Sequence, residues 1–259
     1  MPVPDRNFTR QASALLARHL TAMGDAGIDR IWLRPGTKLE VVPAPEESPA
    51  MNAWRSLAAR AAAAPEPRAL GTLRETFVFG TGNPGARLML VGEAPDMDVE
   101  STGSPYAGAN GEMLGKIIAT MGLDKEDVYF TNIVKYRPLI AGGDQGAENR
   151  RPSWEEITAC LPMLHQEMEL VQPEVIVALG TAALTGLTGN PAMKITGAKG
   201  KFTACLGIPV MASYHPDYLN NIKDVDKLRV EKRRFWEDML LVMEKLGLPI
   251  TARQRGFFK

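Results

Sequence analysis

The sequence predicts an α/β fold, a three-layer α/β/α sandwich with a central four-stranded, mainly parallel sheet, preceded by a helical N-terminal extension. Two observations predict this architecture. Apolar runs of strand length alternate with helical patterns, an order typical of parallel strands joined by right-handed crossovers. The runs are also apolar on both faces, as strands are when helices cover both sides of a sheet. The runs lie at residues 86–95, 127–138, 173–184 and 208–218, and the helical patterns between them at 107–123, 153–171 and 181–187.

The first 70 residues are predicted to form a helical extension with a linker. Residues 8–33 space Ala, Leu and Met at helical intervals. A segment rich in proline and acidic residues follows at 34–50, and we interpret it as a linker or surface arm. A second short helix is expected at 53–67. The α/β domain is therefore placed at residues 71–259.

The charge of the chain is balanced, with 30 basic and 30 acidic residues, which argues against binding nucleic acid by bulk electrostatics. The distribution is less even, because residues 227–259 hold nine Lys or Arg residues against four acidic ones. Such a segment is either a solvated amphipathic helix or a face that contacts phosphates. Charge alone leaves both interpretations open.

Cysteine usage and hydropathy indicate a reducing, aqueous environment. The two cysteines, Cys160 and Cys205, are far apart in the sequence, which argues against a disulfide framework, a zinc ribbon or a self-contained iron–sulfur site. The N-terminus lacks the apolar stretch of a signal peptide, and no run approaches the roughly 18 apolar residues that span a bilayer. We therefore expect a soluble, cytoplasmic protein without a membrane partner.

Polar side chains follow each of the four predicted strands. Because parallel strands end at the same edge of a sheet, we expect these groups to share one cleft. Each has an ordinary explanation alone, as a cap or a turn residue. Together, a carboxamide, an imidazole, an aromatic ring and several carboxylates can bind a planar polar base and act on charge that develops there. The residues are Glu93 with the acidic loop to Glu100, Tyr106, Thr131, Asn132, Gly180, Thr181, His215 and Pro216.

Five segments, in order and at suitable spacing, resemble the family 4 uracil-DNA glycosylases of bacteria and archaea. The resemblance covers about residues 76–220. It implies a monofunctional hydrolase of base excision repair that flips uracil, or a related deaminated or modified base, out of DNA and cleaves its N-glycosidic bond. It also implies single- or double-stranded DNA as the partner, a monomer, and a place near the nucleoid of a prokaryote. The segments are "FVFGTGNPGARLMLVGEAPDMDVESTGSPYAG", "VYFTNIVKYRP", "ENRRPSWEEITACLPML", "QPEVIVALGTAA" and "SYHPDYL".

The resemblance implies a role in base binding for five residues. Tyr106 matches an aromatic residue, usually Phe, on which the flipped base stacks. Asn132 matches the carboxamide that pairs with O4 and N3–H of uracil, an edge whose pattern is opposite in cytosine. His215 matches a catalytic histidine near O2, where a donor stabilises the departing uracil anion. Glu93 and Ala94 line the same pocket.

The resemblance implies that the acidic loop supplies a catalytic carboxylate. Cleavage builds positive charge on the sugar, and a nearby carboxylate stabilises that charge and orients a water for attack on C1′. The water-positioning glutamate of the family falls on Val99 here, between Asp98 and Glu100, and Asp96 replaces a glycine of the family. A shift of one residue in the loop restores the carboxylate, so we expect Asp98 and Glu100 to be catalytic.

DNA contacts are expected from the rim and from basic residues. Tyr218 or Leu219 is the expected wedge that fills the gap left by the flipped nucleotide. The insertion at 139–151 either contacts DNA or is a plain surface loop. It lacks the nucleophilic histidine with which some relatives crosslink to the abasic sugar, so that chemistry is not expected. The basic residues expected at the backbone are Lys135, Arg137, Arg150 and Arg151.

The iron–sulfur cluster of the family is predicted to be absent. Family 4 enzymes hold a 4Fe–4S cluster with four cysteines, and only the last of these positions is a cysteine here, Cys160. Tyr136 stands where the third would be. One thiolate cannot hold such a cluster, so we expect apolar packing around both residues and no metal cofactor.

Two alternatives stay open. A relative of the fold that binds DNA or modified bases without cleaving them is favoured by Val99. A nucleotide-handling α/β protein of another class is disfavoured, because the turn "VGEAPDMD" is neither a dinucleotide-binding fingerprint nor a P-loop, and its acids repel phosphate.

Overall fold

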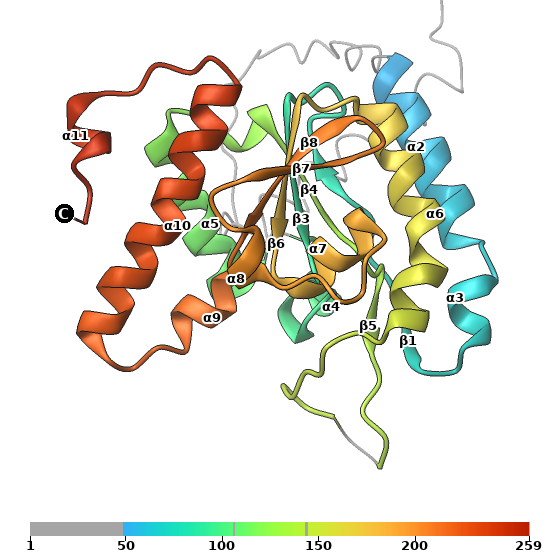
Figure 1. The fold of residues 1–259 in the computed structure, drawn as a ribbon. Coiled ribbons are helices and arrows are strands. Elements are labelled where there is room, and N and C mark those ends of the chain that lie inside the picture. The colour runs from blue at the N-terminus through green and yellow to red at the C-terminus, as the bar shows by residue number, and fades with distance from the viewer. Residues whose placement is uncertain (1–48, 106, 143–144, 259) are drawn as a thin grey trace, which may run out of the picture. The chain divides into compact units, whose positions relative to one another are not determined.

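A six-stranded sheet forms the centre of the computed structural model, which describes residues 49–105, 107–142 and 145–258 (Figure 1). The strand order is β2-β4-β3-β6-β8-β7. The four inner strands are parallel to one another, and both edge strands are antiparallel to their neighbours. The strands are β2 (Thr81–Gly82), β3 (Leu88–Gly92), β4 (Val128–Asn132), β6 (Val175–Leu179), β7 (Phe202–Cys205) and β8 (Ile208–Ser213).

The four inner strands confirm the predicted mainly parallel sheet, and every residue of β3, β4 and β6 is buried. The edge strands were not predicted. β2 has two residues, and β7 is largely exposed, so neither carries the doubly apolar pattern of the others. The predicted run at 127–138 is also divided. It leaves the sheet after Asn132, and β5 (Tyr136–Pro138) pairs with β1 (Leu73–Phe77) in a separate antiparallel ribbon.

Two helical layers cover the sheet, as expected of a three-layer sandwich (Figure 1). One layer holds α5 (Gly108–Met121), α9 (Pro216–Asn220) and α10 (Val225–Lys245); the other holds α6 (Trp154–Val171) and α7 (Thr181–Thr188). Successive strand residues enter opposite cores. Leu88 and Leu90 pack in the core under α5 and α10, whereas Met89 and Val91 pack in the core under α6 and α7.

The N-terminal part of the described chain packs on the outside of α6. Helix α2 (Pro49–Ala62) contributes Leu57 and Ala61 to a small apolar cluster with Met163 of α6. This helix confirms the one expected from residue 53 on, whereas the predicted helix at 8–33 lies outside the described residues. The predicted domain limit at residue 70 stays a prediction.

Several helices, both long and short, begin at a side-chain cap. Asp96 accepts from the Val99 N–H at the start of α4, and Ser153 and Glu156 form a capping box at the start of α6. None of the helices in the described ranges is long and apolar enough to cross a membrane. The short elements are α3 (Glu66–Ala69), α4 (Met97–Thr102), a 3₁₀ turn (Lys125–Asp127), α8 (Ile195–Ala198) and α11 (Ala252–Arg255).

Candidate active site

A cleft of about 750 Å³ lies at the carboxyl edge of the sheet. Parallel strands end there, and the segments that follow β3, β4, β6 and β8 all contribute to its lining. The structure thus brings together groups from four strand ends that are distant in sequence. Of the residues selected from the sequence, those that line the cleft are Glu93, Ala94, Thr131, Asn132, Arg150, Arg151, Gly180, Thr181, His215, Pro216 and Tyr218.

Asn132 ends β4 and presents its carboxamide to the cleft with only 7% of the residue exposed. It lies beside Gly92, its partner in the parallel pair β3–β4. A Cβ at position 92 would overlap Asn132 Oδ1, so the glycine leaves the space that the carboxamide occupies. A nearly buried amide with a donor and an acceptor is suited to reading the polar edge of a planar ligand.

Glu93 follows β3 and is held at the N-terminus of α7. Its Oε1 accepts from the Ala182 N–H at 3.2 Å and lies against Gly180, whose φ of 96° is one that glycine adopts readily. A side chain at Gly180 would collide with this carboxylate. Ala94, the next residue, lines the cleft beside it.

His215 caps α9 and has a defined tautomer. Its Nδ1 accepts from the Asp217 N–H at 3.2 Å, so the neutral ring carries its proton on Nε2 and can donate from there. Burial lowers the pKa of His215, and the negative charges of Glu93, Asp217 and Asp96 oppose that shift. The imidazole is therefore a neutral donor at neutral pH.

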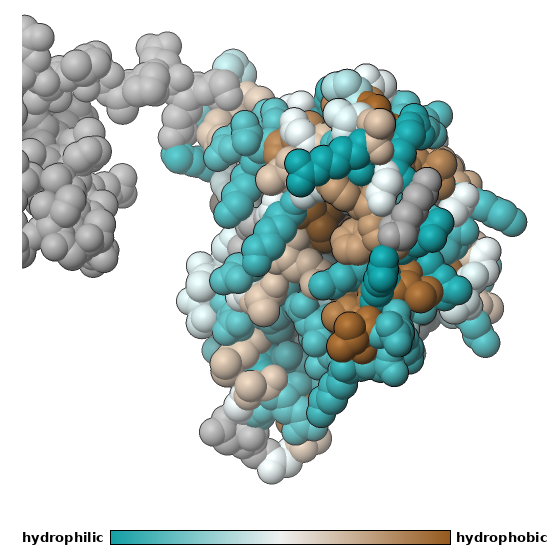
Figure 2. Space-filling model, turned by 90° about the vertical axis from the view of Figure 1, so that its left-hand side faces the viewer, coloured by the Kyte–Doolittle hydropathy of each residue, from teal (hydrophilic) through white to brown (hydrophobic). Residues whose placement is uncertain are grey.

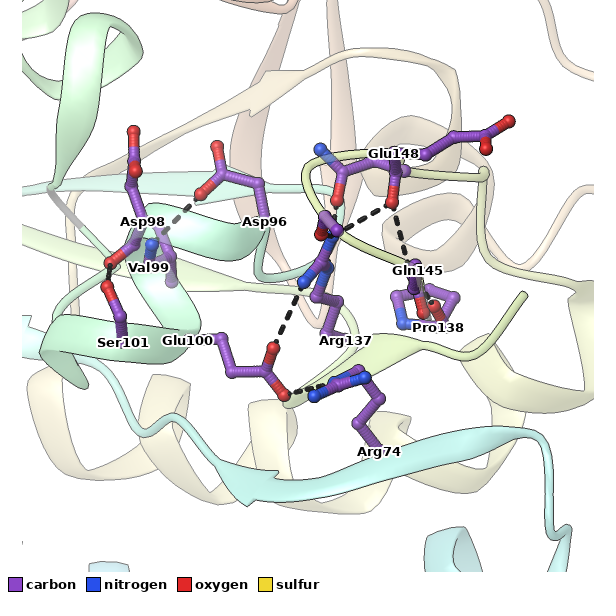
Figure 3. Close-up of polar contacts among 12 residues, drawn as sticks. Arg74, Asp96, Asp98, Val99, Glu100, Ser101, Arg137, Pro138, Gln145 and Glu148 are labelled. Carbon is purple, nitrogen blue, oxygen red and sulfur yellow. Dashed lines mark hydrogen bonds and ion pairs between the residues drawn. The ribbon is translucent and has the colours of Figure 1, made fainter. Parts of the chain in front are cut away.

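The acidic loop folds partly into α4, and this separates its carboxylates. Val99 is buried and lines the cleft. Asp98 is exposed and packs against Gly108 outside the lining. Glu100 is bound by Arg74 at 2.6 Å and by Arg137 at 3.2 Å, and Figure 3 shows it directed at these arginines while Asp96 points away from them. The structure therefore brings neither Asp98 nor Glu100 into the cleft.

A cap signal in the sequence predicts this arrangement. Asp96 is an N-cap residue, and three positions later Val99 supplies the N–H that it accepts. In a helix, adjacent residues point about 100° apart, so an inward-facing Val99 forces Asp98 and Glu100 away from the cleft. As the acidic loop expected from the sequence, this segment allows a shift of one residue in register, whereas helix α4 does not.

Tyr106 lies outside the described residues, so its role in stacking stays a prediction. Pro105 and Ala107, which flank it, both line the cleft.

The rim helix α9 distinguishes the two wedge candidates. Tyr218 is 40% exposed and lines the cleft, with its ring centroid 4.8 Å from that of Tyr214. Leu219 is only 2% exposed and packs in the core under α9 and α10. Its burial corrects the prediction for Leu219, since it cannot insert into DNA without leaving the core.

Burial also corrects the predicted DNA contacts of Lys135 and Arg137. Lys135 has no exposed surface; its Nζ donates to Glu167 at 2.9 Å and to Thr131 Oγ1 at 2.5 Å. Arg137 is bound by the Glu100 carboxylate and by the carbonyl oxygens of two residues of the insertion, Gly146 and Glu148, as Figure 3 shows in part. Both cations are structural, and neither can reach a phosphate.

The other two arginines lie at the cleft. Arg150 forms a two-pronged ion pair with Glu156, at 2.9 and 2.6 Å, and also donates to the carbonyl oxygens of Leu139 and Thr72. Arg151 is exposed. Contact with DNA stays a prediction for both, and Arg151 is the more accessible of the two.

Helix α10 covers the sheet with its apolar face. Phe235, Trp236 and Met239 are buried in the core. Figure 2 shows the side of the molecule on which α10 lies, and hydrophilic residues cover most of this side, with hydrophobic residues in small separate groups. Several basic residues there are paired with acids, such as Arg233 with Glu237 at 2.9 Å. These contacts favour the interpretation as a solvated amphipathic helix.

The sequence reasoning missed cleft residues that α10 and the end of β8 supply. Glu231 and Arg234 form an ion pair of 3.1 Å and line the cleft beside Tyr214. Burial, together with the charge of Glu231, raises the pKa of Tyr214 to about 12. Tyr214 lies within the predicted run at 208–218, but it was not selected as a cleft residue. The approach of α10 to the cleft depends on tertiary packing, so no local sequence pattern predicts the positions of Glu231 and Arg234.

The residues present do not fit an iron–sulfur cluster. The chain has two cysteines, and such a cluster takes four thiolate ligands. Cys160 and Tyr136 are both fully buried in the core under α6, and burial raises the pKa of the Cys160 thiol. Within the described ranges, no group of three or more His, Cys, Asp or Glu side chains is placed to hold a metal ion.

A family model and several related proteins point to the same family. Residues 79–240 match the model of the uracil DNA glycosylase superfamily. The type-4 uracil-DNA glycosylase of Thermotoga maritima is 37% identical over 147 residues, which cover 56% of this chain and 72% of that protein. The type-4 enzymes of Pyrobaculum aerophilum and Archaeoglobus fulgidus are each 36% identical over 150 residues, covering 55% of this chain and 72% and 71% of the relatives.

Proposed function

The chain belongs to the uracil DNA glycosylase superfamily, and on that premise we propose that it removes uracil, or a related deaminated or modified base, from DNA by hydrolysis of the N-glycosidic bond. The observation that carries the proposal is the meeting of Asn132 and His215 in one cleft. The first is a nearly buried carboxamide, and the second is a neutral imidazole with its Nε2–H available.

Asn132 reads the base in this proposal. Its amide N–H donates to O4 of uracil, and its Oδ1 accepts from N3–H. Cytosine presents a donor and an acceptor in the reverse order, so the same carboxamide, held in place beside Gly92, disfavours it. Tyr106 supplies the aromatic face for stacking, and Glu93 and Ala94 complete the wall of the base pocket.

His215 stabilises the leaving group. As the C1′–N1 bond breaks, its electron pair stays with the base, and negative charge spreads to O2. A neutral Nε2–H donor at that oxygen stabilises the anion without giving up its proton, because a neutral imidazole is a very weak acid. The Asp217 N–H, which donates to Nδ1, keeps the ring in this tautomer.

The base reaches this cleft by flipping out of the helical stack, since the glycosidic bond is otherwise hidden. Tyr218, exposed on the rim, fills the gap that the nucleotide leaves. Arg151 contacts the phosphate backbone, with Arg150 contributing its remaining exposed surface.

We further propose that the protein acts as a cytoplasmic monomer, associated with the nucleoid, and without a metal cofactor. All groups invoked for the reaction come from one chain, which supports a monomeric enzyme. Apolar packing of Cys160 and Tyr136 supports a fold that is stable without the cluster.

The experiment compares wild type and His215→Ala on an oligonucleotide with one uracil, with release followed by alkaline strand cleavage. Loss of the imidazole donor is expected to slow release on the order of 100-fold or more. Glu126→Gln, an exposed change in the 3₁₀ turn at the opposite edge of the sheet, serves as the control. Wild-type protein that binds the oligonucleotide without releasing uracil favours the non-cleaving alternative.

A further inference from the structure

Among the residues that the structure describes, four carboxylates line the cleft, and they differ in burial and in the contacts of their oxygens. They are Glu93, Asp96, Asp217 and Glu231. Hydrolysis needs one of them to face the sugar with an oxygen that can accept a proton from water. The contacts of each decide which one is available.

Three of the four are placed for other tasks. Glu93 is bound at the N-terminus of α7 by the Ala182 N–H and is packed against Gly180. Glu231 is ion-paired through Oε1 with Arg234 on α10, and its Oε2, which has no hydrogen-bond partner among the described residues, is buried away from solvent. Asp217 holds His215 through its backbone N–H and not through its carboxylate, and it is set apart by its exposure on the rim.

Asp96 has one oxygen fixed and one available. Its Oδ1 accepts from the Val99 N–H at 2.9 Å, which orients the carboxylate. Among the described residues, Oδ2 has no hydrogen-bond partner. The side chain is half-buried in the cleft, and its charge acts on His215, since it raises the pKa of that imidazole against the effect of burial.

We propose that Asp96 is the carboxylate that orients and deprotonates the attacking water, an inference that rests on the proposed glycosylase function. The water oxygen forms a bond to C1′ as the C1′–N1 bond breaks, and the electron pair of that bond leaves with the base. The water proton passes to Asp96 Oδ2 and then to solvent. The departing uracil anion, held at O2 by His215, takes up a proton as it is released.

In this assignment Asp96, the N-cap residue of α4, positions the attacking water, a function that the hydrocarbon side chain of Val99 cannot perform. Val99 presents a hydrocarbon surface to the cleft, whereas Asp96 enters the same cleft one helical turn earlier. The loop thus keeps a carboxylate at the reacting centre through a different position, without any shift of register.

The test measures uracil release under single-turnover conditions by Asp96→Asn and Asp96→Ser. Both replacements keep an N-cap acceptor for the Val99 N–H, so α4 is expected to fold. Each is expected to slow release about 100-fold or more while the affinity for the uracil oligonucleotide, measured by fluorescence anisotropy, stays within a few-fold of wild type. Glu126→Gln, tested in parallel, is expected to match wild type.

Other outcomes overturn the assignment. Release by both Asp96 variants at the wild-type rate excludes Asp96 as the base. Loss of binding in parallel with loss of release indicates a structural role instead. If Asp98→Asn or Asp217→Asn is slow while Asp96→Asn is not, the base is that other residue. Wild-type protein that never releases uracil contradicts the proposed function itself, which keeps the two failures distinguishable.

Discussion

At the scale of single residues, the backbone around the cleft determines what each functional side chain can do. Gly92 leaves the space for the Asn132 carboxamide, and the Asp217 N–H fixes the tautomer of His215. A side chain at position 92 would displace the Asn132 carboxamide. A proton on Nδ1 of His215 would break the hydrogen bond from the Asp217 N–H. In the proposed mechanism, base selection and leaving-group stabilisation therefore depend on neighbours that contribute only backbone.

The first prediction concerns base selection by Asn132. Asn132→Asp replaces the amide donor with an oxygen, so the pairing with O4 of uracil is lost. We expect uracil release to fall on the order of 100-fold or more, because the site then presents an unpaired or repulsive group to the base. The measurement compares release from uracil-containing and cytosine-containing oligonucleotides. A variant that behaves like wild type on both contradicts the assignment of Asn132.

The second prediction concerns pH and His215. Burial lowers the pKa of this histidine below its ordinary value, so the unfolded chain binds a proton more readily than the folded one. Stability is therefore lost as the pH falls from the ordinary histidine pKa of about 6.5 toward the lowered one.

We expect the free energy of unfolding of wild type to decrease more between pH 7 and pH 5 than that of His215→Gln, measured by urea denaturation. Equal pH dependence in the two proteins would contradict a neutral, half-buried imidazole.

At the scale of elements, α9 carries a rim residue and a core residue side by side. Leu219→Ala removes a side chain packed under the helix and is expected to destabilise the protein by about 2–5 kcal/mol. Tyr218→Ala is expected to leave stability nearly unchanged and to slow release from double-stranded DNA about 10-fold more than from single-stranded DNA, because only a duplex leaves a gap to fill. A similar loss on both substrates would argue against the wedge.

The buried ion pair between Lys135, in the bend that follows β4, and Glu167 of α6 stabilises the fold and does not serve DNA binding. Lys135→Met leaves Glu167 as an uncompensated buried charge and is expected to cost about 3–5 kcal/mol of stability. The double variant Lys135→Met, Glu167→Leu is expected to recover part of this loss, because no charge is left unpaired.

Arg151→Ala, by contrast, is expected to leave stability unchanged and to reduce the salt dependence of DNA binding by about one unit of the log–log slope. The measurement is DNA affinity over a range of salt concentrations. Salt dependence that falls in a folded Lys135 variant and not in Arg151→Ala would reverse this account.

The sequence predicts the inner strands and the residues at their ends, but not the buried partners of the cations. The inner strands carry doubly apolar runs and their ends carry polar groups, so the cleft and its Asn132 and His215 follow from local patterns. The burial of Lys135 and Arg137 does not, because their partners Glu167 and Glu100 are 32 and 37 residues away. A lysine or arginine near a strand end has the same local sequence pattern whether its partner is a phosphate or a buried carboxylate.

For the whole molecule, charge is organised locally rather than as one basic face. The chain is neutral overall, and part of the excess of basic residues beyond residue 227 is paired with acids on α10. Nonspecific attraction to DNA is therefore expected to be weak, and binding to depend on the few cations at the cleft.

Uracil release by the wild-type protein is the most direct test of the proposed function. Single- and double-stranded oligonucleotides with one uracil are incubated with excess protein and resolved after alkaline treatment, beside matched strands with thymine. Strand breaks are expected at the uracil alone, independent of added metal. Intact uracil strands from protein that is folded and binds DNA would contradict that function.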